Sequence, residues 1–235
     1  RVNAFDWTTE FPNVFLSGGF DAVIGNPPYV LLQWFESEDS QAYLRNRYAV
    51  ARYKLDTYHL FIERGVELCR PGGVFGYITP SSFLRNKFAR DLRQYILEKT
   101  NPRTLRVFQY PVFRGASVDT CILVADRAAS DAAAHVEVQQ SSARNAVGSV
   151  ERVSLNDWRS HPAFEFSVST GRSSSSVSSR FTSRAFALGK ICDAYFGIQT
   201  HDRSRYVSTD RRGEQSRPVI DGGNIARFDL SPPTE

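Results

Sequence analysis

The apolar residues between positions 20 and 126 follow two different periods along the chain. Short apolar runs bounded by glycine, proline or polar residues predict buried strands. Such runs occupy residues 20–25, 74–79, 105–107 and 118–124. The first of them ends at a glycine followed by two prolines, which predicts a strand with a stiff loop at its carboxyl end.

Two segments between these predicted strands have apolar side chains at helical spacing. One covers residues 56–70, where Arg70-Pro71-Gly72-Gly73 is expected to stop the helix after a basic last turn. The other covers residues 86–97, and the polar segment 36–53 predicts a further helix or a mobile loop. Because strands and helices alternate, we expect an α/β fold with a mainly parallel sheet.

The composition changes after residue 166. The segment from about Ser167 to Arg184 is rich in serine and lacks the apolar content to pack, so we expect a linker or a long loop. The residues after it have ordinary globular composition but are too few to hold a core alone. The sequence therefore predicts a catalytic part at 1–166, a linker at 167–185 and the beginning of a second region at 186–235.

Charge and cysteine content narrow the classes of function only slightly. The net charge of +4, with a pI of about 9.1, permits a polyanionic partner without demanding one. The three cysteines are widely separated and the four histidines have no metal-ligand spacing, so we expect reduced thiols and no metal site. We expect a cytoplasmic protein, since no apolar stretch approaches about 18 residues and no leader opens the chain. The chain has no methionine, so we expect it to be an excerpt of a longer protein.

One tetrapeptide, Asn26-Pro27-Pro28-Tyr29, carries a specific chemical signal because it follows a predicted strand where α/β sheets bind ligands. A rigid loop can aim the Asn26 side-chain oxygen and the Pro27 carbonyl at the two N–H bonds of an amino group. These acceptors stabilise the positive charge that develops when a conjugated nitrogen attacks a methyl group. Tyr29 is expected to lie flat against the substrate ring. If that ring is a base in duplex DNA, it must first be flipped out, and the stacked aromatic offsets part of that cost, at about 1–3 kcal/mol per base.

With this tetrapeptide, residues 20–126 resemble the amino-methyltransferase family that includes the adenine-specific (N6) DNA methyltransferases of restriction-modification systems. Three further segments carry the resemblance in the expected order: residues 56–63 (DTYHLFIE), 71–84 (PGGVFGYITPSSFL) and 111–122 (PVFRGASVDTCI). Weaker similarity at residues 196–200 and 218–228 is typical of the target-recognition region in fused type II enzymes. The implied fold is the C-terminal half of a Rossmann-like methyltransferase sheet, followed by the start of a target-recognition domain.

The resemblance implies transfer of a methyl group from S-adenosylmethionine to the N6 amino group of adenine in DNA. Residues 26–29 match the catalytic motif, and Phe113 matches the aromatic that covers the second face of a flipped adenine. Phe61, with Tyr58 beside it, matches the aromatic face that borders the cofactor. The implied partners are double-stranded DNA and either the upstream part of the same protein or a companion chain, in a prokaryotic cytoplasm.

The sequence departs from the family pattern in one respect that concerns the cofactor. The glycine-rich loop that cradles S-adenosylmethionine and the acidic residue that grips its ribose are absent from these 235 residues. We therefore expect the isolated chain to bind the cofactor negligibly and to be inactive.

Other interpretations stay open on the sequence alone. A protein glutamine methyltransferase shares the tetrapeptide, because an amide nitrogen is equally unreactive, and an RNA adenine methyltransferase is a third candidate. The chain could also be a catalytically inactive, DNA-binding remnant of such an enzyme. Phe113 and Phe61 each have a plainer interpretation as core residues, and Asp119 beside an apolar strand is expected to be structural.

Overall fold

The computed structural model describes residues 5–31, 37–51, 56–113, 118–129, 131, 133–144, 148–168 and 190–193, and the strand residues 225–226 and 229–230. The chain divides into two units, Arg1–Ser175 and Ser176–Glu235. In the second unit, β7 (Ile225–Ala226) pairs with β8 (Asp229–Leu230) in an antiparallel ladder. The predicted linker from residue 169 onward and most of the predicted recognition region lie outside the described residues.

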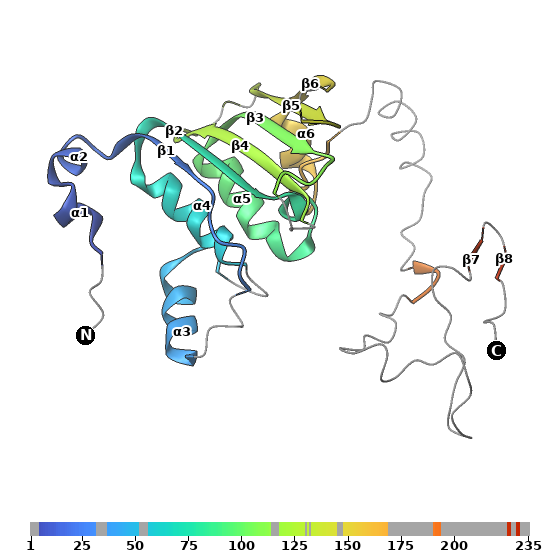
Figure 1. The fold of residues 1–235 in the computed structure, drawn as a ribbon, viewed down its shortest axis with the longest axis horizontal. Coiled ribbons are helices and arrows are strands. Elements are labelled where there is room, and N and C mark those ends of the chain that lie inside the picture. Colours follow the sequence, from blue (N-terminus) through green and yellow to red (C-terminus); the bar gives the residue numbers. More distant parts are fainter. Residues whose placement is uncertain are drawn as a thin grey trace. The chain divides into compact units, whose positions relative to one another are not determined.

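The first unit is built on a six-stranded sheet with the order β1-β2-β4-β3-β5-β6 (Figure 1). Its strands are β1 (Phe20–Gly25), β2 (Cys69–Pro80), β3 (Asn101–Phe108), β4 (Thr120–Asp126), β5 (His135–Ser141) and β6 (Val150–Ser154). This sheet, together with the helices of the same unit, confirms the predicted α/β fold class. The expectation of a mainly parallel sheet is wrong, because three of the five strand pairs are antiparallel.

The antiparallel pairs follow from the connection between β3 and β4. No helix separates these two strands in the described residues, so β4 returns antiparallel to β3 and lies between β2 and β3. As a result β1, β2, β3 and β5 run in one direction, and their carboxyl ends share one end of the sheet. We call this the carboxyl end of the sheet.

Helices of the first unit agree with the predicted segments where the apolar period was clear. They are α1 (Trp7–Glu10), α2 (Pro12–Leu16), α3 (Glu38–Arg47), α4 (Thr57–Leu68), α5 (Arg90–Lys99) and α6 (Leu155–Ser160), with short 3-10 turns at η2 (Ser81–Leu84) and η3 (Lys87–Ala89). The polar segment 36–53 contains a helix, α3. α4 ends at Leu68, two residues before the predicted stop, and Gly72 adopts a φ of 76° within the irregular start of β2.

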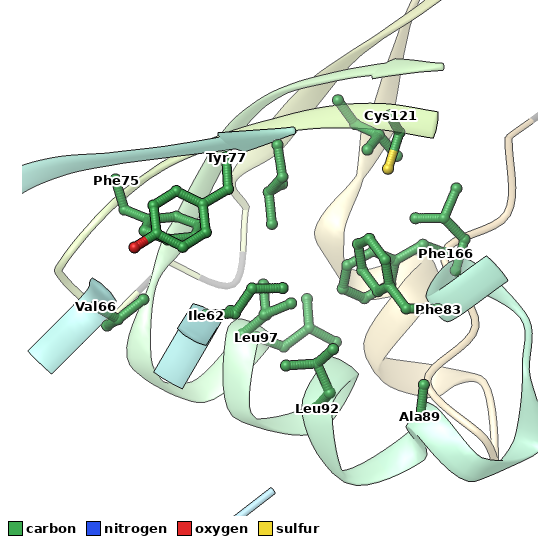
Figure 2. Close-up of a cluster of buried hydrophobic side chains, with 14 of the residues drawn as sticks. Ile62, Val66, Phe75, Tyr77, Phe83, Ala89, Leu92, Leu97, Cys121 and Phe166 are labelled. Atoms are coloured by element: carbon green, nitrogen blue, oxygen red, sulfur yellow. The ribbon is translucent and has the colours of Figure 1, made fainter. Parts of the chain in front are cut away.

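The core lies between the sheet and the helices α4 and α5. Figure 2 shows apolar side chains of both helices, Ile62 and Leu92 among them, pointing toward Phe75 and Tyr77 of β2. Ile62, Leu92 and Phe75 are each 1% exposed. This packing fixes α4 directly beneath β1 and β2, and so positions the first turn of α4 against the loop that follows β1.

Candidate functional site

The tetrapeptide lies at the carboxyl end of β1, which is an outer strand of the described sheet. Gly25 precedes it and pairs with Tyr77 of β2. A Cβ atom at Gly25 would lie 2.9 Å from the Tyr77 ring, so glycine allows the close approach that sets the direction of the loop. Of the residues that follow, Asn26 is exposed and Pro27 is buried.

Tyr29 holds the Asn26 side chain in position. Its hydroxyl donates to Asn26 Oδ1 at 2.9 Å and also reaches the carbonyl of Ile78 in β2 at 3.3 Å. Burial raises the pKa of Tyr29, so the hydroxyl keeps its proton at neutral pH and remains a donor. An amide oxygen has two acceptor sites, so Asn26 Oδ1 retains one for a second donor.

Thr57, at the start of α4, fastens the other half of the loop. Its hydroxyl donates to the carbonyl of Pro28 at 2.7 Å and accepts from the backbone N–H of Val30 at 3.3 Å. Its own N–H donates to the Val30 carbonyl at 2.8 Å. Thr57 is 5% exposed, so these bonds are shielded from water. Sequence reasoning missed this residue, because nothing local links it to a loop 29 residues upstream.

The two proline carbonyls therefore differ. Thr57 occupies the carbonyl of Pro28, whereas the carbonyl of Pro27 accepts no hydrogen bond within the described part of the chain. The loop thus leaves two acceptors without a full set of partners in the described residues, Pro27 O and one site on Asn26 Oδ1, and their role toward an amino group stays a prediction. Both come from a segment whose geometry is fixed by neighbours in β2 and α4.

Tyr58 occupies a different place from the one expected of a cofactor ligand. It is 1% exposed and contacts the Tyr29 ring edge-to-face, with centroids 6.2 Å apart and planes at 79°. The helical face that carries Tyr58 is turned into the core, so in this structure the side chain supports Tyr29 and presents almost no surface to a ligand. Phe61, on the outer face of α4, is 45% exposed and can contact one.

Phe113 lies on the loop after β3, at the carboxyl end of the sheet that also carries Asn26. It is partly buried, and it makes no ring contact with Tyr29 in the described part of the chain. Two strands separate β1 from β3, which corresponds to about 14 Å at the usual strand spacing. The structure brings the two residues to the same end of the sheet, and the two-sided clamp on a base stays a prediction.

Among the described residues, no group of three or more His, Cys, Asp or Glu side chains could hold a metal ion. Within the same residues, none of the helices combines the length and the apolar composition needed to span a membrane.

Comparison with known proteins relates the first half of the chain to a protein family. Residues 1–113 match the Eco57I restriction-modification methylase family, which confirms the predicted resemblance over this part of the chain. The type II restriction enzyme and methyltransferase RM.Eco57I of Escherichia coli is 31% identical over 142 residues, covering 59% of this chain and 13% of that protein. The type II methyltransferase M.BstVI of Geobacillus stearothermophilus is 34% identical over 103 residues, covering 39% and 18%. The chain spans less than a fifth of the length of these relatives.

Among solved structures, the methyltransferase subunit of a type I restriction-modification system from Streptococcus thermophilus is similar to this chain. The TM-score is 0.44 and the sequences are 19% identical, with 61% of this chain and 31% of that chain covered.

Proposed function

We propose that this chain carries the amine-binding part of a DNA adenine-N6 methyltransferase. The premise is that residues 1–113 match the Eco57I restriction-modification methylase family. The observation that carries the proposal is the pair of acceptors at the carboxyl end of β1. Asn26 Oδ1 is oriented by Tyr29, and Pro27 O is left unengaged while Thr57 holds Pro28 O. The exocyclic amine of adenine has two N–H bonds that match two such acceptors.

These acceptors lower the barrier by acting on the developing charge. The N6 lone pair is delocalised into the adenine ring, and hydrogen bonds from both N–H groups favour the pyramidal nitrogen that attacks. As the nitrogen–carbon bond forms and the carbon–sulfur bond breaks, positive charge grows on the nitrogen and the two oxygens stabilise it. The extra proton leaves to water afterwards, so the loop needs no strong base. Fixed acceptors are effective because they need no reorganisation as the charge develops.

S-adenosylmethionine supplies the electrophilic methyl group when bound. The chain's described residues fit it only in part. Phe61 exposes an aromatic surface on α4 that suits an adenine ring. The remaining polar contacts are expected from a part of the protein beyond these 235 residues, or from a companion chain.

The proposed substrate is double-stranded DNA with the target adenine flipped out of the helix. In this proposal Tyr29 stacks on one face of that base and Phe113 covers the other. DNA is favoured over a protein glutamine or an RNA adenine because the relatives are restriction-modification enzymes by name. The proposed setting is the prokaryotic cytoplasm.

The test is methyl transfer from tritiated S-adenosylmethionine to DNA by the full-length gene product, with the methylated base identified after hydrolysis. The unaltered protein should produce N6-methyladenine, and Asn26→Ala should abolish transfer with little loss of DNA affinity, because phosphate contacts dominate affinity. Asn26→Ala with near-normal turnover, or label found in cytosine or in protein, refutes the proposal.

A further inference from the structure

A cavity of about 340 Å³ opens at the carboxyl end of the sheet, on the far side of β2 from β1. Its volume lies at the lower end of the range for ligand sites. None of its lining residues is acidic. Its polar lining comes from Ser81, Ser82, Arg85, Gln109 and Gln140.

Arg85 is the one charged residue in this lining. Its side chain is exposed and makes no hydrogen bond or ion pair within the described part of the chain. A guanidinium presents several donors in a planar fork that matches two oxygens of a phosphate. Arg85 therefore has its full donor capacity available to an anionic ligand.

The backbone around Arg85 is held firmly by a buried cation. Arg93 is fully buried, and it donates to the carbonyls of Phe83 at 2.6 Å and Asn86 at 2.7 Å, on either side of Arg85. Arg93 also donates to the carbonyl of Ala163 at 2.8 Å, which ties this loop to the chain near α6. The loop is thus preorganised, so an ion bound by Arg85 does not have to order the backbone first.

Basic side chains outnumber acidic ones along this segment. Residues 81–91 contain Arg85, Lys87 and Arg90 and one acidic residue, Asp91, and Asp119 lies beside Ser81. Arg90 is partly engaged with Asp91, at 3.6 Å, and with Gln94. Lys87 lies over the Phe88 ring. At the cavity wall, Gln109 donates to Gln140 at 2.8 Å, which fixes two neutral amides beside the cationic rim.

The separation between this cavity and the tetrapeptide is one that a few nucleotides of a strand could span. Tyr29 contacts the carbonyl of Ile78, and Ser81 at the cavity rim is three residues further along the same segment. Three extended residues span about 10 Å. This is about the length of three stacked nucleotides, at about 3.4 Å each.

We propose that this cavity and Arg85 bind a backbone phosphate of the DNA strand that carries the target adenine, within about three nucleotides of the flipped base. The inference rests on the proposed function and adds a second contact that orients the strand across the carboxyl end of the sheet. Contacts of this type position the nucleic acid and do not read its sequence.

Binding of a fluorescein-labelled DNA duplex to the 235-residue chain, followed by anisotropy at several salt concentrations, tests the inference. Arg85→Gln removes the proposed contact. Lys99→Gln is the matched control: it removes one positive charge at the exposed end of α5, next to the start of β3 at the opposite end of the sheet. Inorganic phosphate, added as a competitor, distinguishes a site for free phosphate from a site for a DNA strand.

Arg85→Gln should weaken binding on the order of fivefold and reduce the slope of log Kd against log salt by about 0.9, while Lys99→Gln should match the unaltered chain. Both variants should keep the parent melting temperature. Equal affinities for Arg85→Gln and Lys99→Gln overturn the inference, as does displacement of the duplex by low concentrations of phosphate or an unaltered chain that fails to bind DNA.

The outcomes separate the two proposals. If Arg85→Gln binds DNA normally while Asn26→Ala loses N6 methylation, the phosphate site is refuted and the proposed methyltransferase function is supported. If Arg85→Gln binds DNA more weakly while the full-length gene product methylates no adenine, the phosphate site is supported and the proposed function is refuted.

Discussion

Thr57→Val is the sharpest test of how the tetrapeptide loop is held. Valine keeps the branched shape of threonine in a site that is 5% exposed, and it removes only the hydroxyl. Two hydrogen bonds are lost, to Pro28 O and from Val30 N, at about 1 kcal/mol each. If both act on loop geometry in the transition state, kcat should fall by up to about 30-fold, since about 1.4 kcal/mol is a factor of ten in rate.

Steady-state methyl transfer by the full-length gene product, over a range of DNA concentrations, measures this effect. The released Pro28 carbonyl and Val30 N–H allow the loop to shift, so kcat should fall while the KM for DNA stays near the parent value. Thr57→Ser keeps the hydroxyl and should retain most of the rate, which separates loop positioning from simple packing. An unchanged kcat in Thr57→Val, or an equal loss in Thr57→Ser, would refute the positioning role.

Three further predictions concern the site and its surroundings. Tyr29→Phe should lower kcat by about tenfold with DNA affinity kept, because the single hydroxyl proton, shared between Asn26 Oδ1 and the carbonyl of Ile78, is lost while the ring remains; equal turnover would contradict this. Burial lowers the pKa of His59 to about 3, below its usual 6.5, so the unfolded state takes up a proton first as pH falls. The stability present at neutral pH should therefore decline by up to about 1.4 kcal/mol per pH unit between pH 6.5 and about 3, and chemical denaturation of His59→Gln should show a flatter profile. Calorimetry on the 235-residue chain should detect negligible binding of S-adenosylmethionine, and micromolar affinity would show that the cofactor site lies within it.

Much of the fold could be predicted because its signals are local. The strand before the tetrapeptide and the helix α4 have clear apolar periods, and the structure places both within a few residues of the expected bounds. β5 was missed, although its alternating burial shows that a two-residue period was present at Val136 and Val138. The prediction of mainly parallel strands was wrong. Strand direction depends on whether a helix connects β3 and β4, and the spacing of apolar residues does not report this.

The candidate site likewise contains residues that the sequence could indicate and residues that only the packing reveals. Asn26 and Tyr29 could be proposed from the sequence because their motif is contiguous, and the chemistry of two fixed acceptors follows from the residue types. Thr57 could not, since its role depends on a contact with Pro28 that only the packing of α4 creates. The resemblance put Tyr58 with Phe61 on the aromatic face that borders the cofactor; in the structure Tyr58 is buried and Phe61 is exposed, a difference that the sequence does not report.

The two roles given to Tyr29, orienting Asn26 and stacking on a base, use different parts of the side chain. Its hydroxyl lies in the plane of the ring, so the hydrogen bond to Asn26 leaves the two faces of the ring unobstructed. The edge-to-face contact with Tyr58, at 79°, can occupy at most one of those faces. The bond that holds the Asn26 acceptor also restrains the Tyr29 ring, so the loss of the hydroxyl alone should affect the rate more than the affinity.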